Sequence, residues 1–388
     1  MRILFYADTV FGFGGVQRVL AVIAKSLSVR HDVSILSTDL NPDMSMYGYG
    51  DSNIHFDYIH YESPHDMQYC LCKAASLLYK TLLPKNDATA SVYARSFFLP
   101  RYKKMLVRKI NNGHYDVVIG VHAFLSLHLA SVRAQLNVAR VIGWMHNCYD
   151  ALFEKQSPYL PGLKSFFSSA MRHLDDIVVL SQSDSKDFAS RLGLKSIVIY
   201  NPLTLQPRGH ASRSHCRFLS VGRFSPRHKG FDLLIRAFAL FAKTNDEWTL
   251  EIVGEGEEEP LYREMISEYG LHDRILVTPF TKDIQSHYAG SSVYVLSSRW
   301  EGQPLVLVEA MSHGLPVISS DIPISTEILS GKSFCRLFEC GNADALAAAM
   351  SEMSGIDDWQ RLSDESMAYS RHFDISHILN QWDNIIKF

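Results

Sequence analysis

Two glutamates on either side of a proline mark the part of the sequence with the clearest chemical potential. Glu301 and Glu309 flank Pro304, directly after an apolar run. We expect Pro304 at the first position of a helix, where its missing N–H is not needed. The N–H groups of Leu305 and Val306 would then form an anion site at the positive end of the helix dipole. Carboxylates on either side of an anion can accept hydrogen bonds from hydroxyls, which is the pattern of a nucleotide sugar; the alternative is two surface glutamates favoured by the dipole.

Two cations upstream could bind the anion. Arg223 and Lys229 flank a loop between an apolar run and an amphipathic stretch, and we expect Asp232 to be the N-cap of the helix that follows. An arginine fork and a lysine point charge near the carboxyl end of a strand suit a diphosphate. The alternative is a solvated basic loop, of which Arg227 and His228 would be the more typical members.

A glycine-rich loop follows the first apolar run, with the sequence Gly-Phe-Gly-Gly-Val-Gln-Arg at residues 12–18. It is similar to a dinucleotide-binding fingerprint, but Arg18 stands where the third glycine would be. Gly14 and Gly15 favour close approach of the backbone to a ligand at a helix N-terminus.

Short apolar runs that alternate with amphipathic stretches must position these residues. Many runs are rich in Val and Ile and nearly continuous, as in strands buried on both faces of a parallel sheet. The runs lie at 3–7, 33–36, 117–121, 141–144, 177–180, 197–199, 218–221, 250–253, 275–277, 293–296 and 316–318. Helical patterns lie between them, for example at 16–28, 233–243 and 304–313. Repeated strand–helix units predict an α/β fold with doubly wound sheets.

The length and composition set further limits. A chain of 388 residues predicts two to three domains at roughly 150 residues each. We place a joint at 201–214, which contains Pro202, Pro207 and Gly209, with six or seven strands before it and about six after it. The net charge of −3 does not favour nucleic acid as a partner. The six cysteines form no CxxC pair, so we expect no metal cluster and a reducing, cytoplasmic environment.

One segment, at 95–110, is strongly basic. It has no acidic residue and has aromatic and aliphatic residues between six cations: Arg95, Arg101, Lys103, Lys104, Arg108 and Lys109. This pattern predicts an amphipathic helix that contacts an anionic membrane surface. The alternative is a solvated basic helix that packs its aromatic face on the core.

Together these motifs resemble the retaining glycosyltransferases of family 4, and the resemblance extends over essentially the whole chain. The E-x7-E signature of that family corresponds to Glu301 and Glu309, and its G-R…K-G motif to Gly222, Arg223, Lys229 and Gly230. Its first-loop G-G-x-E-R corresponds to residues 14–18, with Gln17 in place of the usual Glu, and its P-S is replaced by Ser297-Ser298.

The resemblance implies a GT-B fold, in which two Rossmann-like domains face a cleft. We expect the acceptor-side domain at 1–203, completed by a C-terminal helix at about 374–388, and the donor-binding domain at 204–373. The resemblance also implies transfer of a hexose or N-acetylhexosamine from a nucleotide sugar, with UDP as the first expectation for the base and GDP-mannose as the next.

The resemblance also implies roles for individual residues. Arg223 and Lys229 would bind the diphosphate, with Gly222 in the same loop. Glu309 would hold the ribose and Glu301 the transferred sugar. Leu305 and Val306 would add their N–H groups.

Other roles depend on the ends of strands. The N–H of Gly15, with Gly14 beside it, would reach the distal phosphate, and backbone near Gly254 and Phe280 would contact the base. His122, at the end of the run 117–121, would contact the sugar. His146 ends the next run and is a second candidate, on the acceptor or donor-phosphate side.

Several broader expectations follow from the family. The acceptor would be a glycan, lipid-linked, in bacterial lipopolysaccharide, O-antigen or other surface polysaccharide synthesis at the cytoplasmic face of the inner membrane. We expect no cofactor and no metal, because two cations and helix dipoles can stabilise the leaving nucleoside diphosphate. The main alternative is a GT-B sugar-nucleotide 2-epimerase; a binding protein with a vestigial site and a Rossmann dehydrogenase are further ones.

Overall fold

The structure is a computed structural model that describes residues 1–39, 41–59, 67–84, 89, 93, 99–155 and 158–387. The chain divides into two compact units. The first consists of Met1–Pro202 with Ile375–Phe388, and the second of Leu203–Asp374. Both boundaries lie within one residue of those expected from the sequence.

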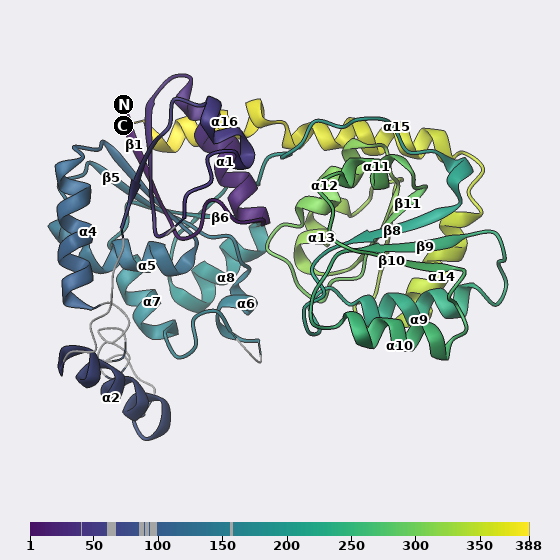
Figure 1. Cartoon of the computed structure of the whole chain (residues 1–388), viewed down its shortest axis with the longest axis horizontal. Coiled ribbons are helices and arrows are strands. Elements are labelled where there is room, and N and C mark those ends of the chain that lie inside the picture. The colour runs from purple at the N-terminus through teal and green to yellow at the C-terminus, as the bar shows by residue number, and fades with distance from the viewer. Residues whose placement is uncertain are drawn as a thin grey trace. The chain divides into compact units, whose positions relative to one another are not determined.

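The first unit contains a seven-stranded parallel sheet in the order β3-β2-β1-β4-β5-β6-β7 (Figure 1). Its strands are β1 (Arg2–Ala7), β2 (Asp32–Ser37), β3 (His55–Tyr58), β4 (Val117–Val121), β5 (Arg140–Trp144), β6 (Asp176–Val179) and β7 (Ile197–Val198). Its helices are α1 (Gly15–Ser28), α2 (Met67–Thr81), α4 (Pro100–Asn112), α5 (Ala123–Val132), α6 (Tyr149–Phe153), α7 (Lys164–Met171), α8 (Gln182–Leu192) and α16 (Ile375–Ile386), with short 3-10 turns η1 (Met46–Asp51) and η2 (Arg133–Gln135).

The second unit repeats this plan with a six-stranded parallel sheet in the order β10-β9-β8-β11-β12-β13. Its strands are β8 (Arg217–Val221), β9 (Thr249–Val253), β10 (Ile275–Thr278), β11 (Val293–Leu296), β12 (Val317–Ser320) and β13 (Cys335–Phe338). Its helices are α9 (Phe231–Phe241), α10 (Glu259–Glu268), α11 (Ile284–Ala289), α12 (Leu305–Ser312), α13 (Pro323–Leu329), α14 (Ala343–Ser354) and α15 (Trp359–Ser370), with turns η3 (Arg213–His215) and η4 (Arg371–Phe373).

The strand orders place a topological switch point in each sheet. From β1 the chain builds toward β3, and from β4 it builds toward β7, so the crevice between the carboxyl ends of β1 and β4 is the expected ligand position. In the second sheet the same position lies between β8 and β11. The glycine loop and His122 follow β1 and β4, and the two charged motifs follow β8 and β11. These motifs therefore lie at the two switch points.

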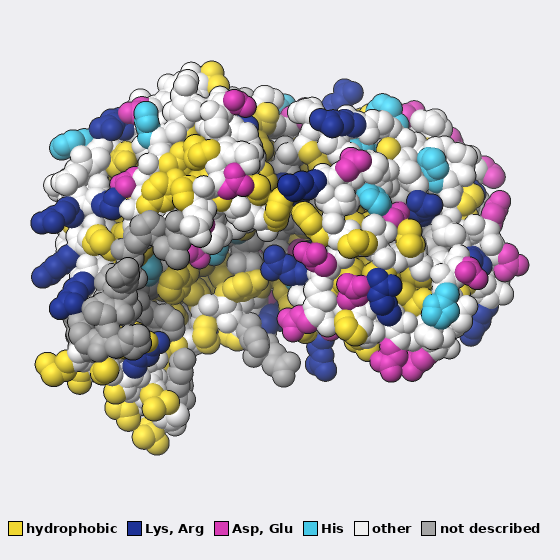
Figure 2. Space-filling model, viewed as in Figure 1, with side chains coloured by type: hydrophobic (Ala, Val, Ile, Leu, Met, Phe, Trp, Pro, Cys, Tyr) yellow, Lys and Arg dark blue, Asp and Glu magenta, His cyan; other side chains and the backbone are white. Residues whose placement is uncertain are grey.

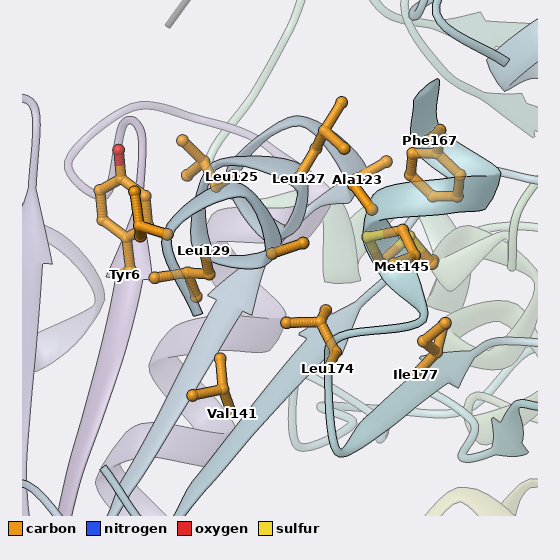
Figure 3. Packing of buried hydrophobic residues seen from close by; sticks show 14 of the residues in the cluster. Tyr6, Ala123, Leu125, Leu127, Leu129, Val141, Met145, Phe167, Leu174 and Ile177 are labelled. Carbon is orange, nitrogen blue, oxygen red and sulfur yellow. The ribbon is translucent and has the colours of Figure 1, made fainter. Parts of the chain in front are cut away.

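Helix α5 is the centre of the first unit's core. Its leucines pack among side chains from the sheet and from α7 (Figure 3). The helix lies unusually close to β4: a Cβ on Gly120 would be 2.8 Å from the Cα of Ser126. The Ser126 hydroxyl donates to the carbonyl oxygens of Gly120, at 2.8 Å, and His122, at 2.9 Å. This packing fixes the start of α5 and with it the position of His122.

The C-terminal helix α16 packs on the first unit although it follows the second in sequence. It lies beside α1 (Figure 1). The Trp382 ring packs on that of Trp144 with centroids 4.9 Å apart, and Asp383 pairs with Arg30 at 2.9 Å. Among the described residues, we find no helix with both the length and the apolar character needed to cross a membrane.

Candidate active site

The loops that follow β8 and β11 are locked together through their backbones. Gly230 has φ 68° and is the N-cap of α9; a Cβ there would lie 2.1 Å from the carbonyl oxygen of Ser297. The Ser297 hydroxyl donates to the Lys229 carbonyl at 2.8 Å, and the Arg299 N–H donates to the His228 carbonyl at 2.8 Å. Only glycine permits this approach, which places both charged motifs in one rigid frame.

The expectation that Asp232 caps α9 is wrong. Gly230 occupies the N-cap, and Asp232 lies in the first helical turn. Its two carboxylate oxygens accept from the Arg299 guanidinium at 3.0 and 2.8 Å. Burial opposes the charged form, but the hydrogen bonds and charge of Arg299 outweigh it and lower the pKa of Asp232. This bidentate ion pair is a second contact that holds the two loops together.

Lys229 and Glu301 form an ion pair in this frame. The Lys229 ammonium lies 2.7 Å from Oε1 of Glu301, and the two side chains are 15% and 9% exposed. The Ser298 hydroxyl also donates to Oε1 at 2.7 Å. Burial would raise the pKa of Glu301, but the charges of Lys229 and His228 and these hydrogen bonds lower it below its usual value. Glu301 is therefore ionised at neutral pH.

His228 is part of the site and not a solvated loop residue. Its ring stacks on Trp300 with centroids 4.8 Å apart, and its Nε2 lies 2.9 Å from the Trp300 carbonyl oxygen. The same nitrogen is 3.8 Å from Glu301. Burial lowers the pKa of His228, with the Glu301 charge acting in the opposite direction. From sequence alone, His228 is interpreted as a member of a solvated basic loop, because basic loop residues are usually exposed.

Helix α12 begins one residue later than expected. Pro304 is its N-cap, with φ −73° and ψ 103°, so the prediction that Pro304 occupies the first helical position is wrong. Because the ψ of Pro304 is extended, this residue lies just outside the helix, and Leu305 and Val306 are the first two helical residues. Their N–H groups belong to the four at a helix start that have no partner inside the helix. The anion-binding geometry inferred from the sequence thus remains available.

The second glutamate of the motif is buried in α12. Glu309 is 1% exposed, and its two oxygens accept from the hydroxyls of Thr204 and Tyr288, each at 3.0 Å. Thr204 is the second residue of the second unit, and Tyr288 is in α11. Neither partner belongs to a sequence motif, and the only signal for either is that Thr204 lies in the predicted joint.

Arg223 differs from Lys229 in being exposed at the end of β8. Within the part of the chain that the structure describes, its guanidinium has no carboxylate partner within 4.0 Å. The backbone beside it is tightly packed: a Cβ on Gly254 would lie 1.9 Å from the Gly222 carbonyl oxygen. Phe280, two residues beyond β10, is 45% exposed. The structure thus brings Gly222, Arg223 and Gly254 together at neighbouring strand ends.

In the first unit, the glycine loop is supported by a tyrosine. The Tyr47 hydroxyl donates to the Gly12 carbonyl at 2.9 Å and accepts from the Gly14 N–H at 3.3 Å. Gly14 is the N-cap of α1 and Gly15 its first residue. Gln17, which stands for the family's Glu, donates from Nε2 to the Thr9 hydroxyl at 2.9 Å. The loop is therefore held at the amino end of α1, as expected for close approach to a ligand.

His122 and His146 lie at the ends of adjacent strands, β4 and β5, with ring centroids 6.3 Å apart. His122 has φ 78°, a backbone conformation that non-glycine residues rarely adopt and that is concentrated at functional sites. Burial lowers the pKa of His122 to about 4, although Asp8 at the end of β1 acts to raise it. Burial also lowers the pKa of His146 well below its usual value. Both imidazoles are neutral at pH 7, and the strained backbone favours His122 as the principal residue.

The basic segment is helical from Pro100, and Arg95 lies outside the described residues. Leu106 and Ile110 of α4 are buried in the core, while Arg101, Lys104 and Arg108 are exposed and Lys103 and Lys109 are partly so. Lys109 pairs with Asp57 at 2.6 Å. The apolar face of α4 thus packs on the core, as in the alternative considered above, and membrane contact through its cations remains a prediction.

A cavity of about 440 Å³ elsewhere in the first unit is lined by residues of α7 and α8. Its two cations are already matched by acids: Lys164 pairs with Glu154 and Arg191 with Asp187, each at 3.0 Å. It offers little net charge to an anion, and the two switch points remain the better candidates.

Comparison with known proteins identifies the family. The family described as "Glycosyltransferase Family 4" matches residues 13–206, which is half of the chain, and "Glycosyl transferases group 1" matches residues 212–361. An uncharacterised glycosyltransferase of Haemophilus influenzae is 27% identical over 309 residues, covering 78% of this chain and 84% of that protein. The lipopolysaccharide 1,6-galactosyltransferase of Salmonella typhimurium is 30% identical over 132 residues, or 32% of this chain and 36% of that protein.

The fold is also that of solved glycosyltransferases. The crystal structure of Anabaena HepE in complex with UDP and glucose superposes with a TM-score of 0.75 at 18% identity, covering 99% of this chain and 98% of that chain. Two parallel sheets, each with a switch point that carries the expected motif, agree with that assignment. The chain therefore belongs to glycosyltransferase family 4 and is a glycosyltransferase with the GT-B fold.

Proposed function

We propose that the chain transfers a hexose or N-acetylhexosamine from a UDP-sugar to a lipid-linked glycan, with retention of configuration at the anomeric carbon. The observation that carries the proposal is the set of four charged side chains at the β8–β11 switch point. Arg223 and Lys229 follow β8, and Glu301 and Glu309 lie on either side of the start of α12. Cations and helix N–H groups suit a diphosphate, and carboxylates suit hydroxyls, so this order matches sugar, diphosphate and ribose.

Binding of the donor would exchange partners within the site. Lys229 forms an ion pair with Glu301. A diphosphate offers Lys229 a more highly charged partner, and a sugar hydroxyl can then donate to the released Glu301 carboxylate. Arg223, which is exposed, needs no such exchange and would make the first contact.

Ribose hydroxyls would bind to the Glu309 carboxylate. Glu309 accepts two hydroxyl hydrogen bonds, from Thr204 and Tyr288. Ribose hydroxyls are donors of the same kind, and a carboxylate has about four lone-pair sites in all. A ribose could therefore add to these contacts or replace that of Thr204, the partner nearer the unit boundary.

The switch point of the first unit carries uncharged groups that suit a polar substrate. With a pKa of about 4, the His122 imidazole is neutral and can exchange hydrogen bonds with a sugar hydroxyl without adding charge. The N–H of Gly15, at the start of α1, is a donor suited to an anionic group.

Cations of the protein would stabilise the leaving group. Cleavage of the bond from the anomeric carbon to the phosphate oxygen leaves both bonding electrons on UDP, so negative charge develops on the β-phosphate. Arg223, Lys229 and the N-terminus of α12 are positioned to stabilise that charge. We propose on this basis that transfer needs neither a metal nor a cofactor.

The acceptor and the base are inferred from relatives. The Salmonella relative is named for lipopolysaccharide, which supports a glycan acceptor of bacterial surface polysaccharide synthesis at the cytoplasmic face of the inner membrane. HepE was solved with UDP, which supports a UDP-sugar donor. A GT-B 2-epimerase is not favoured, because the matched relatives reported above are named as transferases.

The experiment is a transfer assay with UDP- and GDP-sugars, carried out with and without a lipid-linked glycan acceptor. We expect UDP release that requires the acceptor, and a product whose anomeric proton coupling in NMR matches that of the donor. Epimerisation without acceptor would favour the 2-epimerase, and a product of opposite configuration would exclude retention. The Glu301→Gln variant should transfer the sugar more slowly. Its control is Glu257→Gln, which is altered at an exposed glutamate of the same unit.

A further inference from the structure

Helix α2 has an exposed apolar face. Of the fifteen large hydrophobic side chains exposed in the described residues, six lie between Met67 and Leu83. Met67, Leu71, Leu78 and Leu82 recur at intervals of four or seven residues, so they share one stripe of the helix. Their exposed fractions are 79%, 63%, 49% and 77%. A stripe of this kind on a protein surface indicates an interaction site.

The stripe does not hold α2 in place, since other contacts do so. Tyr79 is 2% exposed, and its hydroxyl donates to the Gly162 carbonyl at 2.6 Å. Its ring stacks on that of Tyr93 with centroids 4.3 Å apart. The helix is therefore fixed on its tyrosine side, and the leucine side remains available to a partner.

The charge of the neighbouring surface identifies the partner. Neither α2 nor α4 contains Asp or Glu. Figure 2 shows basic side chains along α4 and hydrophobic ones over α2 on the same side of the first unit. Arg101, Lys104 and Arg108 of α4 are exposed, as is Lys73 of α2. Two helices that contain no acid and carry apolar side chains next to cations match the interface of an anionic lipid bilayer.

We propose that the leucine face of α2 inserts into an anionic membrane while the cations of α4 contact its head groups. This deepens the proposed function, because a lipid-linked acceptor would be met at that surface. A second copy of the chain fits less well, because an isologous contact would bring the exposed cations of two α4 helices together. The proposal also assigns the apolar contribution to α2, whereas α4, whose apolar face is buried, contributes charge.

The test is co-sedimentation of the full chain with vesicles of phosphatidylcholine alone or mixed with phosphatidylglycerol. The apolar variant combines Leu71→Ser, Leu78→Ser and Leu82→Ser. Its control combines Leu261→Ser and Leu276→Ser, two leucines of the second unit that are 43% and 55% exposed. The charge variant combines Arg101→Ser, Lys104→Ser and Arg108→Ser, with high salt on the wild type as a parallel test.

We expect the wild type to bind the mixed vesicles and the control to bind equally well. The apolar variant should lose about 100-fold or more in partitioning at any salt concentration. The charge variant should lose about 100-fold at low salt and less at high salt. UDP binding, measured by thermal shift, should be unchanged in both, which separates this proposal from the donor site.

Three results would overturn the proposal. One is wild-type protein that ignores anionic vesicles, and another is an apolar variant that binds as the wild type does. The third is a wild-type dimer, detected by light scattering, that the leucine substitutions convert to a monomer without any vesicle binding. A chain that binds vesicles but transfers no sugar would instead leave the membrane surface intact and refute the proposed function.

Discussion

The Lys229–Glu301 ion pair makes a specific prediction, because donor binding has to break it. In Glu301→Gln the carboxylate is replaced by an amide of the same shape, so Lys229 loses its charged partner and is freer to contact phosphate. A hydrogen bond to a charged group contributes about 1.5–3 kcal/mol net. Giving up the lower end of that range predicts UDP that binds about tenfold more tightly to the variant.

Transfer should change in the opposite direction. Without its charge, residue 301 accepts a weaker hydrogen bond from the transferred sugar, and kcat should fall by about 10- to 150-fold for a loss of 1.5–3 kcal/mol. Isothermal titration with UDP and steady-state kinetics with the UDP-sugar measure the two effects. Glu257→Gln, which removes the same charge from an exposed position, should change neither.

The pH dependence of stability provides a check on the ion pair itself. The folded-state pKa of Glu301 is lowered, so the pair adds stability above the unfolded pKa and loses it as the pH falls through the folded one. The difference in unfolding free energy between wild type and Glu301→Gln should therefore shrink below about pH 4. If UDP binds Glu301→Gln no more tightly than it binds the wild type, Glu301 and the diphosphate do not compete for Lys229.

Three further predictions concern the rest of the site. Burial lowers the pKa of His122 to about 4, so the unfolded state binds more protons than the folded state between pH 4 and 6.5. The free energy of unfolding of the wild type should therefore fall by up to about 3 kcal/mol as the pH is lowered across that range. His122→Asn should remove this loss, which denaturant titrations at several pH values measure. Glu309→Gln should lower kcat/KM for the donor by about 10- to 100-fold. The fold should be retained, because the Thr204 and Tyr288 hydroxyls can still form hydrogen bonds with an amide. Unchanged kinetics would show that Glu309 does not bind the ribose. Activity should persist in EDTA, and a preparation that loses activity in chelator and regains it with Mn²⁺ would contradict a leaving group stabilised by Arg223 and Lys229 alone.

The inner strands could all be predicted from sequence, and so could the edge strands β7 and β10, but the other two edge strands could not. Runs such as 117–121 and 293–296 are buried on both faces and are therefore continuously apolar. β3 (His55–Tyr58) and β13 (Cys335–Phe338) lie at the edges of their sheets, where part of each strand is exposed and the apolar pattern breaks. No run was predicted at either place, although the general strand–helix order was.

The positions of the site residues could be predicted better than their partners. Sequence placed Glu301, Glu309, Arg223 and Lys229 at strand ends because strand, loop and helix follow one another along the chain. Thr204, which pairs with Glu309 from 105 residues away, has no local signal that links the two. Such contacts depend on the tertiary packing of the unit, which spacing does not encode.

Helices α2 and α4 show the same limit. The aromatic and aliphatic residues of α4 suggested a membrane-facing side, but Leu106 and Ile110 are buried in the core of the first unit. The apolar pattern of α2 is equally compatible with a core helix, and only its exposure in the structure separates the two cases. Hydrophobic periodicity identifies an apolar face without identifying what covers it.

The central claim is that the β8–β11 switch point binds the diphosphate of a nucleotide sugar. Its most direct test is isothermal titration of UDP into wild type, Arg223→Gln and Arg227→Gln. The two arginines belong to the same loop and both are exposed, but Arg223 is next to the end of β8. We expect Arg223→Gln to weaken UDP binding by about 10- to 150-fold, the equivalent of one charge-assisted contact, and Arg227→Gln to bind as the wild type does. Equal binding by all three proteins would contradict the claim.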